Sequence, residues 1–221
     1  KYQFGFRHHH STNHALISIT EKIRANLDKG NYACGTFLDF KKAFDTVTHP
    51  TLLSKLKHYG IRGIPLKWFE SYLSNRSQYT SIKNNHSEVL NTKYGVPQGS
   101  VLGPLLFLIY INDLNEAVTF SEIHHFADDT NIVFASKSLK EINRKINYDL
   151  KNIALWLRAN KIALNTSKTE VIFFRSKSKQ ITKHLNFRLS GESSQTKYLG
   201  ITLDENLDFK KHLNDIKVKL N

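Results

Sequence analysis

Two adjacent carboxylates, Asp128 and Asp129, are the side chains of this 221-residue sequence best suited to metal chemistry. They lie between two apolar, strand-forming runs within residues 123–134. Mg²⁺ prefers oxygen ligands and is typically held by one or two carboxylates together with substrate phosphates. The pair therefore points to phosphoryl transfer assisted by metal ions. Taken alone, however, an Asp-Asp pair is more often a solvated turn, because turns are rich in Asp.

A third carboxylate, Asp39, follows the apolar residues Phe37 and Leu38, so we place it at or near the end of a strand. A two-metal site needs carboxylates that converge from separate strands on ions about 3.5–4 Å apart. One aspartate at a strand end plus an aspartate pair on a hairpin is the smallest set that meets this requirement. Asp39, Asp128 and Asp129 are therefore the predicted metal-binding and catalytic carboxylates.

The charge balance indicates a polyanionic partner. Lys and Arg number 32 against 19 acidic residues, which gives a formal net charge of +13. Lys and Arg that neutralise phosphates release counterions, so nucleic-acid binding by such a chain should be tight and sensitive to salt. The alternative is a basic domain that has no such ligand.

Composition also bounds the class of protein. Aromatic residues are plentiful, with 14 Phe and 9 Tyr, and 40% of the chain is hydrophobic, which is enough for a real core. The longest apolar run, residues 105–111, suits a buried helix and is too short to span a membrane. The single cysteine, Cys34, allows no internal disulfide and is interpreted as a small buried residue.

The elements that must position these residues follow from hydrophobic periodicity and breakers. Apolar spacing predicts helices over residues 11–27, 48–60, 65–73, from about 101 to 114, and 139–160. The second helix has Pro50 in its first turn, Gly60 at its end and an apolar face made of Leu52, Leu53, Leu56 and Tyr59. Strands are predicted at residues 32–40, 78–83, 87–94, 122–135 as a hairpin, 171–174, 187–189 and 198–203. Helices around a small, antiparallel sheet form an α+β pattern.

Three segments together resemble a known enzyme family. Residues 37–45 (FLDFKKAFD), 95–104 (GVPQGSVLGP) and 126–129 (FADD) resemble, in this order, the A, B and C motifs of reverse transcriptases. The amino-acid sequences of these segments are similar to those of non-LTR retrotransposons of the Jockey and CR1 type. Residues 3–7 with Ser11 and Thr12, Asn165 with residues 168–170, and residues 198–201 also resemble that family, so the similarity covers nearly the whole chain.

The resemblance implies a right-hand polymerase palm, a small antiparallel sheet packed on helices, with partial fingers. Residues 1–35 would be partial fingers and the entry to the palm, and residues 36–190 the palm with inserted finger-like helices. Residues 191–221 would form a primer-grip-like hairpin and the start of the thumb connection. We expect the rest of the fingers, a thumb and an endonuclease to belong to a longer polypeptide, and this piece alone to bind heteroduplex weakly and polymerise poorly.

The resemblance also implies roles at a two-metal site. Asp39 and Asp128 resemble the direct ligands of two Mg²⁺ ions, for which Mn²⁺ could substitute, and Asp129 the third carboxylate, whose ligation varies with catalytic state. The backbone carbonyl of Phe40 resembles a further ligand. Lys168 lies in a position that resembles motif D and could donate a proton to the leaving pyrophosphate, or it could be a solvated surface lysine.

Nucleotide and primer contacts are implied by the remaining motifs. Phe44 matches the sugar-sensing aromatic, which leaves no room for a 2′-hydroxyl; the alternative is a core Phe. Gln98 and Gly99 lie in a loop whose backbone can approach a ligand closely, and the Gln would contact the incoming nucleotide. Asp45 is interpreted as local structure. Tyr198, Leu199 and Gly200 resemble the primer grip, a hairpin that positions the primer end; the alternative is a plain strand with Tyr198 and Leu199 in the core.

Taken together, the resemblance implies an RNA-directed DNA polymerase fragment of a retrotransposon. Its partners would be an RNA template, a DNA primer in heteroduplex, dNTPs and the rest of the retrotransposon polyprotein, with no membrane. The family implies an intracellular ribonucleoprotein with access to the nucleus, and the sequence itself leaves the location open. Alternatives are an inactive or domesticated nucleic-acid-binding remnant of the same fold, or a maturase-type intron protein. The histidines at positions 8–10, 14, 124 and 125 are given no ligand role.

Overall fold

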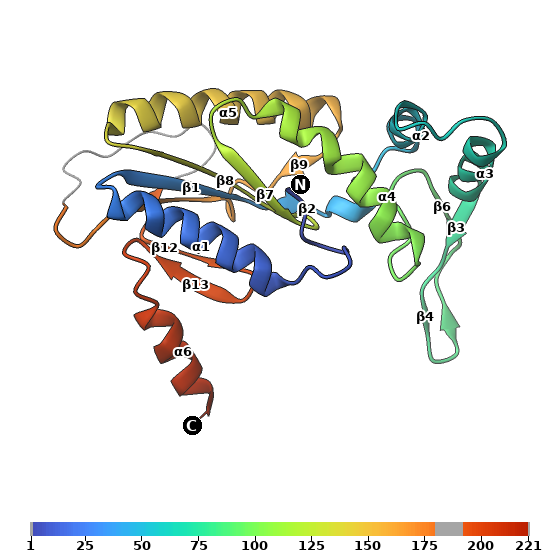
Figure 1. Ribbon diagram of the computed structural model, residues 1–221. Coiled ribbons are helices and arrows are strands. Elements are labelled where there is room, and N and C mark those ends of the chain that lie inside the picture. The colour runs from blue at the N-terminus through green and yellow to red at the C-terminus, as the bar shows by residue number, and fades with distance from the viewer. Residues whose placement is uncertain (1, 180–191, 221) are drawn as a thin grey trace. The chain divides into compact units, whose positions relative to one another are not determined.

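The computed structural model of the chain describes residues 2–179 and 192–220, and Figure 1 shows its elements. The chain forms two compact units. Unit 1 comprises residues 1–41, 114–157 and 163–221, and unit 2 comprises residues 42–113 and 158–162. Each unit has its own sheet or ribbon and its own helices. No helix of the described residues combines the length and the apolar character that crossing a bilayer would require.

Unit 1 is built on a five-stranded sheet in the order β11-β10-β1-β8-β7. The strands are β1 (Tyr32–Leu38), β7 (Glu122–Phe126), β8 (Asp129–Ser136), β10 (Glu170–Phe174) and β11 (Glu192–Ser193). All neighbours are antiparallel except β10 and β11, which are parallel. The central strand β1 is buried at every residue after Tyr32, because β8 and β10 flank it and both faces are covered.

Helices cover the two faces of this sheet (Figure 1). One face carries α1 (Thr12–Asp28) and the hairpin of β12 (Gln195–Tyr198) and β13 (Ile201–Asp204), and α5 (Leu139–Ala159) lies on the other. Ser11 caps α1 by accepting a hydrogen bond from the His14 N–H, at 3.3 Å. The core between the sheet, α1 and the hairpin contains Leu16, Ile19, Ile23, Ala33, Phe37, Val133, Ile172, Phe174, Tyr198, Leu203 and Leu207.

The other elements of unit 1 are short or peripheral. β2 (Phe40–Lys41) pairs with β9 (Ala163–Leu164) directly after the central strand ends. The 3₁₀ helix η2 (Asn112–Ala117) leads into β7. The terminal helix α6 (Lys210–Leu220) buries none of its residues, so it adds little to the core.

Unit 2 packs α2 (His49–His58) against α4 (Leu102–Ile111), with α3 (Gly63–Leu73) next to α2. Its core is made by the buried side chains of Val47, Leu52, Leu56, Leu73, Val96, Leu106, Phe107, Tyr110 and Ile111. A two-part ribbon follows α3, in which β3 (Arg76–Gln78) pairs with β6 (Leu90–Thr92) and β4 (Ser81–Ile82) pairs with β5 (Asn85–His86). The 3₁₀ helix η1 (Ala43–Thr46) precedes α2.

The α+β prediction and the predicted helices are confirmed, and four details of the sequence interpretation are wrong. Tyr59 is 44% exposed, so it does not belong to the apolar face of α2. Residues 198–203 form a turn and a return strand instead of one strand. The strand predicted over residues 32–40 is interrupted at Asp39, and the ribbon strands are shorter than predicted. The strand predicted at residues 187–189 lies outside the described residues.

Candidate functional site

The turn that carries the paired aspartates joins β7 to β8 with only two residues, Ala127 and Asp128. Phe126 pairs with Asp129 across the hairpin, so Asp128 lies at the tip and Asp129 opens the next strand. Ala127 has a φ of +56°, in the left-handed region that residues other than glycine rarely adopt. Backbone conformations of this kind persist only where surrounding contacts enforce them.

Residues 2–5 supply those contacts. The Gln3 side-chain oxygen accepts hydrogen bonds from the backbone N–H groups of Ala127, at 2.9 Å, and of Gly5, at 2.7 Å. The backbone adds two more bonds, from the Phe4 N–H to the His125 carbonyl at 2.8 Å and from the His125 N–H to the Tyr2 carbonyl at 2.9 Å. Residues 2–5, which we call the strap, therefore hold the turn that presents Asp128.

Gly5 is where the strap approaches the turn most closely. A Cβ at this position would lie 2.3 Å from the backbone nitrogen of Ala127. We expect Gly5→Ala to push the strap away and to lower the free energy of unfolding by about 3 kcal/mol, the upper end of the usual cost of overpacking. Urea denaturation measures this change. Gly30→Ala is the control, because Gly30 has a φ of +72° but no atom within 4 Å of its Cβ position; equal losses in the two variants would contradict a close approach at Gly5.

Asp39 is held by a segment far along the chain. Its N–H donates to the Thr169 hydroxyl at 3.3 Å, and its carbonyl accepts from the Asn165 N–H at 2.7 Å. Phe40, the next residue, is buried and pairs with Leu164. The end of β1 is therefore fastened by residues 163–169, the region that resembles motif D, and the buried Thr169 hydroxyl is a contact that sequence reasoning did not assign.

The pairing of Leu38 with Thr130 places Asp39 beside the turn that carries Asp128 and Asp129, and the charges of the three carboxylates act on one another. Burial raises the pKa of Asp128, a backbone hydrogen bond opposes this, and the charge on Asp39 raises it further. Burial, then the charges on Asp128 and Asp39, raise the pKa of Asp129 to about 6. Neighbouring anions without a counter-charge produce shifts in this direction.

Asp39, Asp128 and Asp129 suit a divalent ion that takes its remaining ligands from phosphates and water. Among residues 2–179 and 192–220, no three His, Cys, Asp or Glu side chains form a ready-made metal cage. Mg²⁺ does not require one, because it commonly uses one or two carboxylates and takes its other ligands from phosphates and water. The mutual repulsion of Asp39, Asp128 and Asp129, together with their oxygen donors, fits that mode of binding.

The raised pKa of Asp129 gives a pH dependence of stability. Its folded-state pKa exceeds the unfolded value of 3.8, so in metal-free buffer the ionised carboxylate destabilises the fold above about pH 6, and this penalty disappears as the pH falls toward 4. We expect Asp129→Asn to melt at a higher temperature than the wild type at about pH 8, with the difference shrinking toward about pH 4. Thermal denaturation across this range measures it.

The control for this experiment is Asp28→Asn. Asp28 is an exposed carboxylate at the end of α1, so its replacement removes one negative charge without relieving a cluster. A melting-temperature difference for Asp129→Asn that does not change with pH would contradict the raised pKa.

The predicted primer-grip residues form the tip of the β12–β13 hairpin. Leu199 and Gly200 have φ values of +47° and +87°, so both turn residues are left-handed. Tyr198 is buried and packs against Phe37, with ring centroids 5.3 Å apart. Burial and the charge on Asp129 raise the pKa of Tyr198, while the neighbouring Asn131 side chain lowers it. The hairpin is thus anchored in the core through Tyr198.

The Tyr198 hydroxyl lies next to the Asn131 side chain but in poor hydrogen-bonding geometry. Within the described part of the chain, neither this hydroxyl nor the fully buried Asn131 amide makes a hydrogen bond of acceptable geometry. We expect Tyr198→Phe to raise the free energy of unfolding by about 1 kcal/mol, because a buried polar group without a partner costs about 1–3 kcal/mol. Chemical denaturation measures it, and Tyr198→Ala, which empties the site, should lose about 3 kcal/mol. A less stable Phe variant would mean that the hydroxyl has a partner such as a buried water.

In unit 2, the glycine-rich loop is fastened to the segment after Asp39. The Gly95 N–H donates to the Val47 carbonyl at 2.7 Å, and the Val96 N–H donates to the Phe44 carbonyl at 2.9 Å. Gly95 has a φ of +88°, and a Cβ there would meet the Asp45 backbone at 2.9 Å. Only glycine therefore fits at the point where this loop crosses η1.

Gln98 and Phe44 both have defined partners. The Gln98 amide donates to the Asp45 carboxylate at 2.8 Å, and the half-buried Phe44 stacks on Phe107 with centroids 4.3 Å apart. Asp45, interpreted from sequence as local structure, thus orients Gln98, which lies 53 positions later in the sequence. No local pattern signals a pair so far apart. Gly99 has a φ of +79° with open space around it.

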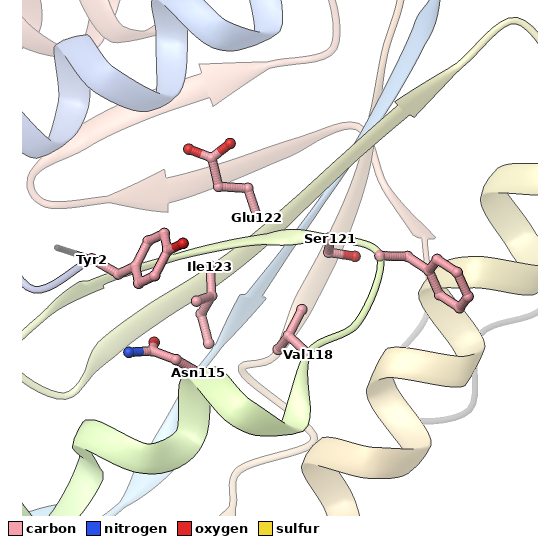
Figure 2. A pocket seen from close by; sticks show the side chains of 7 residues that line it. Tyr2, Asn115, Val118, Ser121, Glu122 and Ile123 are labelled. Carbon is pink, nitrogen blue, oxygen red and sulfur yellow. The ribbon is translucent and has the colours of Figure 1, made fainter.

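A cavity of about 580 Å³ opens beside Gln98 within unit 2. Its lining is polar and partly basic, and consists of Lys42, Asp45, Arg76, Ser77, Gln78, Thr92, Tyr94, Gly95, Val96, Pro97 and Gln98. Arg76 and Tyr94 were not singled out from the sequence. A second cavity, of about 350 Å³, lies in unit 1 between Tyr2, Asn115, Val118, Phe120, Ser121, Glu122 and Ile123 (Figure 2). None of the predicted site residues lines it.

His125, one of the two buried histidines before the aspartate turn, has two hydrogen-bonding partners. His125 contacts the Thr130 hydroxyl through Nδ1 at 2.8 Å and Asn115 through Nε2 at 2.9 Å. Burial and then His124 lower its pKa to about 3, and burial and then Lys22 lower that of His124 to about 4. Both rings are therefore neutral at physiological pH. Lys168, by contrast, is exposed in the turn after Asn165.

The comparison with protein families decides the identity. Residues 1–203 match the family described as reverse transcriptase (RNA-dependent DNA polymerase). The chain belongs to the reverse transcriptase family. This membership confirms the resemblance drawn from residues 37–45, 95–104 and 126–129, and reverse transcriptases generally use divalent metal ions.

Individual relatives place this reverse transcriptase domain among non-LTR elements. It is 32% identical to the RNA-directed DNA polymerase from mobile element jockey of Drosophila melanogaster, with 98% of this chain and 24% of the relative covered. It is 33% identical to the probable RNA-directed DNA polymerase from transposon BS of the same species, with 96% and 24% covered. The domain thus spans about a quarter of the length of these relatives.

Solved structures confirm the fold of this reverse transcriptase domain. The apo telomerase of Candida tropicalis truncated from its C-terminal domain superposes with a TM-score of 0.60 at 15% identity, covering 94% of this chain and 40% of that one. A telomerase from Candida albicans, in complex with a fragment of telomeric RNA, gives 0.59 at 15% identity and covers 91% and 34%. At this identity the likeness concerns the fold alone.

Proposed function

We propose that the chain is the polymerising core of an RNA-directed DNA polymerase, which adds dNTPs to the 3′-end of a primer on an RNA template. The observation that carries this proposal is the cluster of three mutually repelling carboxylates, Asp39, Asp128 and Asp129, on the ends of adjacent strands of one sheet. The net charge of +13 supports a polyanionic substrate.

The proposed metal ligands are Asp39 and Asp128, with Asp129 and the backbone carbonyl of Phe40 as further donors. Two Mg²⁺ ions, or Mn²⁺ in their place, would activate the primer hydroxyl and neutralise the charge that develops on the phosphates. The chain's own task is to hold the carboxylates in place. Gln3 fixes the turn that carries Asp128, and Thr169 and Asn165 fix the backbone of Asp39.

The proposed nucleotide contacts come from η1 and the glycine-rich loop. Gln98, oriented by Asp45, presents a polar edge to the incoming nucleotide, and Gly99 allows its backbone to approach. Phe44 is braced by its stack on Phe107, so its ring resists displacement by a ribose 2′-hydroxyl. This rigidity is what a steric test of the sugar requires.

Two further roles complete the proposed cycle. Lys168 would donate a proton to the leaving pyrophosphate, and its exposed position leaves it able to reach a ligand. The Tyr198–Gly200 hairpin tip would position the primer end, with Tyr198 as its buried anchor. The division into partial fingers (1–35), palm (36–190) and primer-grip hairpin with thumb connection (191–221) is part of the same proposal, as is assembly with the endonuclease, fingers and thumb of a longer polyprotein.

The test is single-nucleotide addition to a DNA primer annealed to an RNA template, with protein in excess over primer. Excess protein compensates for the weak heteroduplex binding that we expect of this chain. Extension should depend on Mg²⁺, should follow the template base and should stop when EDTA is added. Tight heteroduplex binding without extension at any Mg²⁺ concentration would instead support a nucleic-acid-binding remnant.

A further inference from the structure

An aromatic and cationic stack runs along one face of α3 into β3 in unit 2. The Trp68 and Tyr72 rings are nearly parallel, at 10°, with centroids 5.4 Å apart. The Arg76 guanidinium carbon lies 5.4 Å from the centroid of the Tyr72 ring. Trp68 and Tyr72 are four residues apart on α3, a spacing that places side chains above one another on a helix. Arg76 reaches the Tyr72 ring from the start of β3, and we call these three residues the α3 stack.

The α3 stack faces solvent instead of the core of unit 2. Trp68 is 53% exposed, and Arg76 and the neighbouring Lys67 are exposed as well, while Leu73 supplies the buried contact of the same helix. Phe69 meets the Trp68 ring edge-on at 5.1 Å and so steadies it. A large, rigid and exposed aromatic surface next to a cation is suited to binding a flat, electron-rich ligand.

The α3 stack is continuous with the cavity beside Gln98. Arg76 is the last member of the stack and also lines that cavity, with Gln78, Tyr94 and Gln98. Tyr94 is 58% exposed and offers a second aromatic surface there. A ligand that occupies the cavity could therefore extend along α3 without leaving a surface of rings and polar groups.

The charges around the stack favour an anionic ligand. Between residues 62 and 93 the basic side chains are Arg62, Lys67, Arg76, Lys83 and Lys93, whereas the acidic ones are Glu70 and Glu88. Aromatic rings interleaved with cations are typical of surfaces that bind unpaired nucleic acid, in which bases stack and phosphates pair with Lys or Arg. A protein partner would match the apolar side chains of the ribbon better than it would match an arginine stacked on a tyrosine.

We propose that Trp68, Tyr72 and Arg76 form a stacking platform for unpaired bases of single-stranded RNA that continue beyond the cavity lined by Gln98. This inference rests on the proposed function for the identity of that RNA, which is the template strand ahead of the site of synthesis. The platform would keep neighbouring bases of the template unstacked from one another, so that they reach the site of synthesis one at a time. It acts by binding, with no step of the chemistry assigned to it.

The first test is a binding titration that needs no catalysis. The chain has two tryptophans, so Trp156→Phe leaves Trp68 as the only fluorescent indole. An oligoadenylate of about ten nucleotides, within the usual site size of a single-strand surface, should quench its emission saturably. Trp68→Ala and Tyr72→Ala, measured by fluorescence anisotropy of labelled RNA, should weaken binding roughly 5- to 100-fold each. Arg76→Gln should lower the slope of log affinity against log salt by about 0.7.

Matched variants separate stacking from other effects. Tyr148→Ala removes a similarly exposed ring, 50% accessible, from α5 in unit 1, where it packs against Phe120; its affinity should stay that of the wild type. Trp68→Phe keeps a ring and should retain most of the binding. Equal affinity of the wild type, Trp68→Ala and Tyr72→Ala would overturn the proposal. So would loss of self-association in Trp68→Ala with no change in RNA binding, because the surface would then serve protein contacts.

A second test separates this inference from the proposed function. Single-nucleotide addition is compared on a template that ends at the templating base and on one with a long 5′ overhang. Trp68→Ala should raise the KM for the overhanging template only. Equal KM values for variant and wild type on both templates would overturn the platform and leave the polymerase assignment intact. If the wild type extends the primer on neither template while oligoadenylate still quenches the Trp68 emission, the proposed function fails and the RNA platform stands.

Discussion

Asp128→Asn is expected to reduce single-nucleotide addition by on the order of 10³-fold, the scale on which groups that stabilise transition-state charge act. The asparagine keeps the size of the side chain, so the two-residue turn and its hydrogen bond from the Ala127 N–H to Gln3 should survive. What is lost is one negative charge of the cluster formed with Asp39 and Asp129. Single-turnover primer extension at saturating Mg²⁺ measures the effect.

The stability of the same variant shows whether the loss is chemical. Relief of repulsion among the carboxylates should leave Asp128→Asn at least as stable as the wild type in metal-free buffer. Asp28→Asn, on the exposed end of α1, should keep wild-type activity. A folded Asp128→Asn protein that extends primers at the wild-type rate would remove Asp128 from the catalytic set.

Phe44→Ala is expected to raise the efficiency of ribonucleotide addition relative to deoxyribonucleotide addition by about 10²-fold, a usual limit for discrimination by shape alone. The reason is steric, since the ring is braced against Phe107 and cannot yield to a 2′-hydroxyl. Competing single-nucleotide additions of rNTP and dNTP, each reported as kcat/KM, give the ratio directly.

Two outcomes of that experiment distinguish the roles left open for Phe44. Phe44→Tyr keeps the ring and should remain selective for deoxyribonucleotides. If Phe44→Ala loses melting temperature and overall activity but keeps the wild-type ratio, Phe44 is a packing residue of unit 2 and the sugar is sensed elsewhere.

The sequence was sufficient where structure depends on local spacing. The apolar periodicity of residues 11–27 and 139–160 predicted α1 and α5, and the alternating residues around Asp128 predicted the hairpin. The aspartate at the end of β1 was placed correctly because a buried strand must end where its apolar residues end. These features need no knowledge of distant segments.

Features that depend on distant residues were missed. The family resemblance implied a hairpin at Leu199 and Gly200, but the strand pattern did not, because leucine rarely has a positive φ. Its conformation is imposed by the packing of the hairpin on the sheet. Asp45 binds Gln98 from 53 positions away, and Gln3 binds Ala127 from 124 positions away. Hydrogen bonds of this kind leave no periodic signal. Tyr59 was placed in the core by spacing alone, although α2 buries only Leu52 and Leu56 fully.

The position of β1 at the centre of the sheet has a consequence for biosynthesis. Residues 32–38 are synthesised well before both strands that pair with them, residues 129–136 and 170–174. At 5–20 residues per second, this apolar strand would wait roughly 7–27 s for its second partner. During that interval the nascent chain exposes unpaired strand edges, so a chaperone or the ribosome surface has to shield the segment that ends in Asp39. Production of this protein should therefore depend more on translation speed and chaperone supply than its final stability would suggest.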